Sequence, residues 1–353
     1  MKIKLTILES DSNYLQRVVN MFNTKFADEL EIYSFTDYVG AMDSLEEKKI
    51  DVFLAGDSFD IDFNHVPNRC GFAYLVDSLD INTLNGRKAI CKFQKGELIY
   101  KQIMSIYSEH IPNVSGVGGD ISNSAMKTIM FCSPGGGAGT STAAAAAAIS
   151  LAGAGKRVLY LNCEVYGDSD MFFSCDGQFD FSDVIYAVKS NKTNRAMKLQ
   201  STVKQDQTGV YFYSSVKVPL DMMELTMDDY LVLINELKSL DCYDYVILDK
   251  AFPATHKEFE LFNYCNSIVF VTEPSDVATA KFAKAITGIR IVDSQSEYSI
   301  IPRMWVLYNK VGVNEFFQTE IHSLGTIPVY QNVTAGQMAR QLALSGNIFN
   351  QLM

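Results

Sequence analysis

The chain has 353 residues, enough for about two domains of roughly 100–200 residues each. Hydrophobic residues make up 48% of it and charged residues 20%, a composition that allows each half to bury a core of its own. The net charge is −11 at pH 7, and acidic residues outnumber basic ones in both halves. Extended binding to nucleic acid is therefore disfavoured, because it depends on clustered Lys and Arg.

The first residues lack the long uninterrupted apolar stretch of a signal peptide. The longest run of small apolar residues, 143–154, is too short and too weakly hydrophobic to cross a bilayer. Seven cysteines occur without a C-x-x-C pair, as expected of small core residues in a reducing compartment. We therefore expect a cytoplasmic protein that does not insert directly into a membrane.

The first half of the chain alternates short apolar strands with helical patterns. Strands are predicted at residues 3–8, 32–35, 51–55, 72–76 and 89–93, with a closing helix at 98–106. Because this alternation is typical of a parallel sheet covered on both faces, we expect a three-layer α/β/α domain over residues 1–111. Residues 112–125, which are rich in Gly, Ser and Asn, are interpreted as a linker.

The second half, residues 126–353, shows the same alternation over a longer stretch. Strands are predicted at residues 128–132, 158–161, 210–213, 245–248, 267–271 and 304–308, and the helices between them include 230–240 and 277–289. We therefore expect a second three-layer α/β/α domain.

A glycine-rich loop, Ser133–Thr142, follows the first strand of this second domain and precedes an Ala-rich helix. Strand, loop and helix in this order are the context that a phosphate-binding loop requires. The glycines allow backbone N–H groups to turn toward one anion, and the helix N-terminus adds partial positive charge. The alternative is a glycine-rich turn that lets an Ala-rich helix pack closely on the sheet.

Two strand ends favour phosphate binding over the simple turn. Residues 244–249 form an apolar strand that ends in Asp249, an acid that can hold Mg²⁺ through water, as a Walker B aspartate does. Residues 305–310 place Asn309 at another strand end, where a carboxamide can both donate to and accept from the edge of adenine.

Together these residues resemble the MinD/ParA group of P-loop ATPases, whose deviant Walker A loop reads K-G-G-x-G-K-[ST]. The glycines of that loop are matched by Gly136, Gly137 and Gly139, and its hydroxyl residue is matched by Ser141. Gly135 and Thr140 stand where the group has its two lysines. The loop therefore keeps the glycines of the group and lacks its charge.

The resemblance implies ATP and Mg²⁺ as cofactors and assigns residues to each part of them. The phosphates would lie against Gly135, Gly136, Gly137, Ala138, Gly139, Thr140, Ser141 and Thr142. Mg²⁺ would be held by Ser141 and Asp249, and adenine would contact Asn309, Pro328, Val329 and Tyr330. The candidate catalytic residues are Glu164, Asp168 and Asp249.

The first domain resembles the receiver of a response regulator, which implies a flavodoxin-like fold. Receivers carry two adjacent acids after the first strand, where this chain has Glu9 and Ser10, and Gly56 stands at the position of the phospho-accepting Asp. Lys95 matches the receiver lysine. We expect a binding module that does not accept phosphate; the alternative is Asp57 as a shifted acceptor.

A receiver-like domain before a MinD-like domain without its lysines resembles the TadZ/CpaE family. These are localisation and assembly proteins of tight-adherence (Flp, type IVb) pili. The resemblance implies a homodimer that binds pilus secretion and assembly proteins and no nucleic acid. It also implies a place at a cell pole or at the inner face of a secretion complex. The alternative is an active MinD/ParA-type ATPase that positions division, flagellar or partition machinery.

The absent lysines predict that ATP is bound better than it is cleaved. Phosphoryl transfer requires positive charge on the β- and γ-phosphates, and losing one such electrostatic donor costs roughly 10²–10³-fold in rate. Backbone N–H groups and Mg²⁺ remain for binding, so we expect weak or absent hydrolysis. Lys250, directly after Asp249, is a candidate for the missing charge; the alternative is a solvated residue beside a loop.

Overall fold

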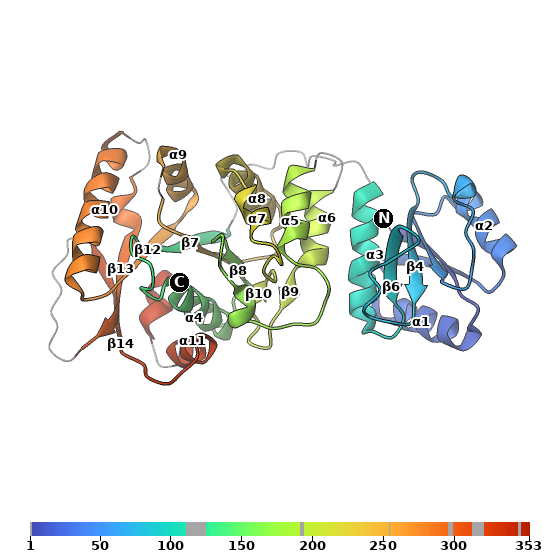
Figure 1. Cartoon of the computed structure of the whole chain (residues 1–353), viewed down its shortest axis with the longest axis horizontal. Helices are drawn as coiled ribbons and strands as arrows, with labels where there is room; N and C mark the ends of the chain where they lie inside the picture. The colour runs from blue at the N-terminus through green and yellow to red at the C-terminus, as the bar shows by residue number, and fades with distance from the viewer. Residues whose placement is uncertain are drawn as a thin grey trace. The chain divides into compact units, whose positions relative to one another are not determined.

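The computed structural model describes residues 2–110, 125–190, 194–253, 255–295, 299–312, 321–344 and 347–353. The chain divides into two compact units (Figure 1). Unit 1 comprises residues 1–115 and 189–202, and unit 2 comprises residues 116–188 and 203–353. The expected linker, 112–125, lies outside the described residues except for residue 125.

Unit 1 is built on a sheet with the strand order β2-β1-β3-β4-β6-β5, in which only the short edge strand β5 is antiparallel to its neighbour. Its strands are β1 (Ile3–Leu8), β2 (Leu30–Phe35), β3 (Val52–Gly56), β4 (Gly71–Val76), β5 (Thr83–Leu84) and β6 (Arg87–Cys91). Its first three helices are α1 (Ser12–Lys25), α2 (Tyr38–Glu47) and α3 (Gly96–His110), and the 3₁₀ turn η1 covers Phe63–His65.

Helices cover both faces of this sheet, which confirms the predicted three-layer receiver-like architecture. Helices α1 and α3 share one core cluster with the inner face of the sheet, and α2 belongs to a second cluster on the other face. Asp11 and Asp37 cap the first two helices, since their carboxylates accept backbone N–H groups of the first turn. The sequence analysis did not predict β5.

Helix α6 (Arg195–Thr202) also belongs to unit 1, where it packs along α3. Lys198 of α6 is buried, and its Nζ donates to Ser105 Oγ at 2.6 Å and lies 3.3 Å from Glu109 Oε1. Residues 189–202 fall within the range expected for the second domain, yet their contacts place them in the first unit. The sequence contains no local signal for this, because α6 lies between elements of unit 2 in chain order.

Unit 2 is built on a sheet with the order β14-β13-β12-β7-β11-β8-β10-β9, parallel except for β9 against β10. Its strands are β7 (Lys127–Cys132), β8 (Val158–Asn162), β9 (Lys204–Gln205), β10 (Tyr211–Phe212), β11 (Tyr245–Asp249), β12 (Ser267–Thr272), β13 (Met304–Val311) and β14 (His322–Pro328). Its helices are α4 (Thr140–Gly153), α5 (Phe181–Lys189), α7 (Leu220–Met223), α8 (Met227–Leu240), α9 (His256–Phe259), α10 (Asp276–Gln295) and α11 (Ala335–Leu344). Its 3₁₀ turns are η3 (Ser169–Met171), η4 (Glu260–Tyr264), η5 (Ile301–Arg303) and η6 (Asn347–Leu352).

Helix α4 lies at the centre of unit 2, between the sheet and α11 (Figure 1). Its alanines, residues 143–148, are all buried, which explains why this stretch needs small side chains on every side of the helix. The predicted P-loop NTPase fold is confirmed: the strand, the glycine loop and the buried helix follow one another as expected. The sequence analysis did not predict β9 or the edge strand β14.

Candidate functional site

The α4 face of the unit 2 sheet carries the polar residues that were predicted at strand ends. In β11, Tyr245 and Ile247 belong to the core on this face, and Leu307 does so in β13. Because alternate residues of a strand share a face, Asp249 and Asn309 extend these two rows past the core. Both therefore come to the carboxyl edge of the sheet, where α/β proteins bind their ligands.

The glycine loop adopts a backbone that only glycine tolerates easily at two positions. Gly137 has φ +76° and Gly139, the N-cap of α4, has φ +89°. No side chain caps the helix, so the first N–H groups of α4 are left for another acceptor. Space is open within 4 Å of the positions where Cβ atoms would lie on Gly136 and Gly137. The N–H of Gly135 donates to Ser133 Oγ at 3.2 Å, and the binding of phosphate by residues 135–142 stays a prediction.

The end of β13 supports this loop. Asn309, which is 3% exposed, donates from Nδ2 to the carbonyl of Ala138 at 2.8 Å and accepts the backbone N–H of Lys310 at 2.9 Å. A Cβ atom on Gly139 would lie 2.2 Å from the same Nδ2 atom, so only glycine fits beside Asn309. The contact of Asn309 with adenine stays a prediction; in this structure its amide holds the loop.

Asp249 is fully buried beneath the loop, at 0% exposure. Its Oδ2 accepts a hydrogen bond from the hydroxyl of Tyr160 at 2.7 Å, whereas Oδ1 has no hydrogen-bond partner among the described residues. Burial raises the pKa of Asp249 to about 7 and the charge of Glu164 adds to the rise, while the hydroxyls of Tyr160 and the nearby Ser141 lower it. The site therefore holds a buried carboxyl group that has no paired cation within the part of the chain that the structure describes.

The two other candidate acids lie in the loop that follows β8. Glu164 is half-buried and lines a small cavity together with Asn162 and Ser169, and burial raises its pKa although Lys250 lowers it. Asp168 is exposed and caps the turn η3, where it accepts the N–H of Asp170 at 2.9 Å. The structure thus brings Glu164 near Asp249, whereas Asp168 stabilises its own loop.

The residues expected around adenine come together in part. Pro328, the last residue of β14, pairs with Val311 of β13 and so lies next to the end of the strand that carries Asn309. Val329 is exposed, and Tyr330 packs against the core around α4. Pro328 ends a strand that the sequence analysis did not predict.

Unit 1 places a second buried acid at the carboxyl edge of its own sheet. Glu9, 2% exposed, lies 3.4 Å from the Nζ of Lys92, which also pairs with Asp77 at 2.7 Å. A Cβ atom on Gly56 would lie 3.0 Å from Glu9 Oε2, so the Glu9 carboxylate fills the space beside the expected acceptor position. A lysine that faces the acid is Lys92, directly after β6, which the sequence analysis did not single out; the match of Lys95 to the receiver lysine stays a prediction.

Comparison with known proteins identifies both domains. Residues 1–108 match the family model of the TadZ-like receiver domain, and residues 126–300 match the model of an AAA domain. The chain therefore joins a TadZ-like receiver domain to an AAA domain. No curated protein matches the chain at a significant level.

One solved structure supports the fold of the AAA domain, and others are similar to it. The crystal structure of a ParA family ATPase from Chlorobium tepidum TLS is 18% identical, with a TM-score of 0.51 over 64% of this chain and 95% of that one. The MinC:MinD cell division complex of Aquifex aeolicus is 17% identical (TM-score 0.48; 64% and 96% covered). MinD complexed with Mg-ADP from Pyrococcus horikoshii OT3 is also 17% identical (0.46; 62% and 94%). At these identities the first structure shows the fold alone.

Three lysines outside the glycine loop of the AAA domain bear on the positive charge that the loop lacks. One was a candidate from the sequence, and two were overlooked. Lys250 is 9% exposed and its Nζ lies 4.6 Å from the centre of the Tyr230 ring in α8, so the solvated alternative was wrong. Lys310 and Lys281 reach the loop from β13 and α10, and sequence reasoning missed both. Lys310 follows Asn309 directly and could have been found; nothing local marks Lys281.

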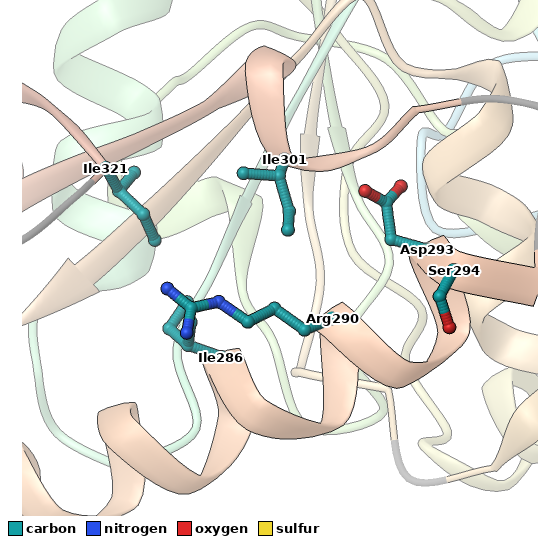
Figure 2. A pocket seen from close by; sticks show the side chains of 6 residues that line it. All are labelled: Ile286, Arg290, Asp293, Ser294, Ile301 and Ile321. Atoms are coloured by element: carbon teal, nitrogen blue, oxygen red, sulfur yellow. The ribbon is translucent and has the colours of Figure 1, made fainter.

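A pocket of about 390 Å³ lies elsewhere in the AAA domain (Figure 2). It is lined by Ile286, Arg290, Asp293, Ser294, Ile301 and Ile321. Figure 2 shows the Arg290 side chain extending across it from the second half of α10. Ile301 precedes β13, whereas Asn309 lies near the carboxyl end of that strand, so the pocket is not part of the P-loop site. Within the described residues, no helix combines the length and apolar character that crossing a bilayer requires.

Proposed function

We propose that the AAA domain binds ATP together with Mg²⁺. The observation that carries this proposal is the buried Asp249, whose Oδ1 has no partner among the described residues and which lies beneath an uncapped helix N-terminus. The backbone of residues 135–142 would hold the phosphates, and Ser141 and Asp249 would hold Mg²⁺. Asn309, Pro328, Val329 and Tyr330 would surround adenine.

The chain's own groups fit such a ligand. Gly136 and Gly137 leave open space where side chains would otherwise stand, so the backbone can approach an anion closely. A single buried carboxylate and a hydroxyl suit Mg²⁺, which commonly takes one or two carboxylates and completes its shell with water and substrate phosphates. When bound, the ion would supply the positive charge that Asp249 lacks.

Titration calorimetry with ATP and Mg²⁺ tests the proposal. We expect saturable binding in the full chain, and Asp249→Asn should weaken the magnesium-dependent part at least about tenfold, since a charge-assisted contact contributes about 1.5–3 kcal/mol. Asp228→Asn is the control, because Asp228 is an exposed acid whose carboxylate pairs with Lys257 at 2.8 Å. The absence of any heat change at millimolar nucleotide would refute the proposal.

We further propose that hydrolysis is weak or absent. Neither Gly135 nor Thr140 can place charge on the phosphates, and a carboxylate at Glu164 with a raised pKa is the remaining candidate to orient water. Glu164, Asp168 and Asp249 remain the candidate catalytic residues. Steady-state phosphate release at about one per second, the slow end of kinase turnover, would contradict this proposal and favour an active MinD/ParA-type ATPase.

The combination of domains supports a role like that of the TadZ/CpaE proteins. We propose a homodimer that localises and assembles the secretion machinery of tight-adherence pili, in the cytoplasm at a cell pole or at the inner face of the complex. Slow turnover suits this role, because an uncleaved nucleotide would hold one conformation for long periods. The receiver domain would serve as a binding module for partner proteins, without nucleic acid.

Two measurements test this role. Light scattering after size-exclusion chromatography should give a dimer, with and without ATP, at tens of micromolar protein. Imaging of a tagged protein in cells that assemble such pili should give discrete foci. A monomer under both conditions would remove the dimer, and a diffuse signal would remove the localising role.

A further inference from the structure

The P-loop is held from outside by the end of β13. The Nζ of Lys310 donates to the carbonyl of Gly137 at 2.8 Å, and Asn309 Nδ2 donates to the next carbonyl, that of Ala138, at 2.8 Å. Lys310 adopts φ +57°, a left-handed conformation that is uncommon for residues other than glycine. The backbone thus accepts some strain where it directs this side chain at the loop.

The hydrogen bonds that hold these two carbonyl groups also orient the backbone N–H groups that follow them. In a planar trans peptide the C=O and the N–H of the next residue point in opposite directions. With the carbonyls of Gly137 and Ala138 turned toward β13, the N–H groups of Ala138 and Gly139 point the other way. Two side chains of β13 therefore set the direction of two backbone N–H groups in the glycine loop.

A second lysine meets the loop from α10. The Cδ atom of Lys281 lies 3.9 Å from the position where a Cβ atom on Gly135 would stand. Lys281 is exposed and forms no ion pair or hydrogen bond with any residue that the structure describes. Its charge is therefore available beside the loop position that lacks a lysine of its own.

We propose that these two lysines replace the absent lysines of the loop: Lys310 holds the loop in its anion-binding conformation, and Lys281 offers its charge to the phosphates. This inference rests on the proposed binding of ATP. Lys310 and Lys281 are positioning and binding residues here, with no part in the transfer of phosphate.

The surroundings of the two lysines explain why their roles differ. Lys310 is paired with Glu273 at 2.8 Å, so its charge is largely balanced before any ligand arrives. The hydrogen bond from Lys310 lowers the pKa of Glu273, which keeps that partner ionised. Lys281 has no such partner among the described residues and retains its charge for an anion. Binding that is equal in the ground and transition states lowers Kd without raising the rate, which agrees with slow hydrolysis.

Three variants of the full chain test the inference: Lys310→Met, Lys281→Met and, as a matched control, Lys284→Met, an exposed lysine three residues farther along α10. Hydrogen exchange without nucleotide reports the loop, and calorimetry with MgATP reports binding. Lys310→Met should speed exchange at residues 137–142 and raise Kd about tenfold. Lys281→Met should raise Kd about tenfold and leave exchange unchanged. Lys284→Met should change neither.

The outcomes separate this inference from the proposed function. Wild-type protein that binds no MgATP would overturn both. Wild-type binding with unchanged Kd in Lys281→Met and unchanged exchange in Lys310→Met would overturn the lysine replacement alone. If Lys310→Met does not fold, Lys310→Gly carries the same test, because glycine adopts this φ without strain.

Discussion

Each domain buries one acid at the carboxyl edge of its parallel sheet, and the two acids are balanced differently. Glu9 directly follows β1 of the receiver domain and pairs with Lys92, a cation that the domain itself provides. Asp249 ends β11 of the AAA domain with a hydroxyl on one oxygen and no hydrogen-bond partner on the other among the described residues. Glu9 Oε2 also has no hydrogen-bond partner among the described residues, so the difference is that a cation of the domain lies 3.4 Å from Glu9, whereas no described cation is paired with Asp249.

The difference follows from the cost of burying charge. An isolated carboxylate in a protein interior is neutralised by a proton, a paired cation or a metal ion. In the receiver domain Lys92 lies 3.4 Å from Glu9, and the Glu9 carboxylate occupies the space beside Gly56. In the AAA domain burial raises the pKa of Asp249, and one of its oxygens has no hydrogen-bond partner among the described residues.

The largest effect is expected from Lys92→Met, which leaves Glu9 buried without its cation. Removing one partner of a buried pair costs about 3–5 kcal/mol, and Lys92 is only 11% exposed. Urea unfolding measures the loss, which should largely disappear in Glu9→Gln/Lys92→Met. Lys25→Met, in a surface pair with Glu97, is the control and should cost less than about 1 kcal/mol. Equal losses in the two single variants would break the comparison.

Asp249→Asn should raise the free energy of unfolding, the opposite of the effect of Lys92→Met, and the size of the gain should depend on pH. The folded-state pKa of Asp249 is raised from 3.8 to about 7, so the folded protein holds a proton that the unfolded chain releases. The stability that this proton contributes is present below about pH 4 and is lost as pH rises to about 7. The variant, which cannot ionise, should therefore be about 2–4 kcal/mol more stable than wild type at pH 8, since each pKa unit corresponds to 1.36 kcal/mol.

Urea unfolding in EDTA at pH 4, 6 and 8 measures this difference. The gain should grow with pH and be close to zero at pH 4. A gain of the same size at every pH would mean that Asp249 is not the uncompensated charge that the comparison requires.

Gly139→Ala should cost about 1–3 kcal/mol, because alanine would be strained at φ +89° and would meet the amide of Asn309. Gly136→Ala is the matched control in the same loop: open space surrounds its Cβ position, and we expect a change within about 0.5 kcal/mol. Thermal unfolding of both variants checks this. If the two substitutions cost the same, Asn309 does not hold the loop as described.

The smallest effect is expected from acetyl phosphate, which should leave the receiver domain unmodified. Gly56 offers no carboxylate, and the Glu9–Lys92 pair fills the adjacent space. Intact mass after incubation with Mg²⁺ measures this for wild type and for Gly56→Asp, and neither should gain phosphate. A stable adduct on Asp57 would show that the receiver site is open after all.

Local sequence patterns predicted most of the fold and part of the site. Alternating apolar strands and helices indicated two α/β domains, and the glycine loop before an Ala-rich helix indicated the P-loop. Asp249 and Asn309 could be found because a polar residue that ends an apolar strand comes to the carboxyl edge of a parallel sheet. The edge strands β5, β9 and β14 were missed: β5 and β9 have only two residues each, and a strand at a sheet edge, such as the seven-residue β14, needs little of the continuous apolar pattern that marks a central one.

Only the tertiary structure decided which charged side chains lie next to which partners. Lys310 reaches a loop 173 residues away in sequence, and Lys92 lies 3.4 Å from Glu9. The packing of α6 on α3 joins segments that the chain order assigns to different domains. Periodicity and motifs indicate the secondary structure of a segment and the face on which each residue lies, since both depend on residues nearby in the sequence. The partner of a charged side chain depends on how elements that are far apart in the sequence pack together, and local sequence patterns do not report that packing.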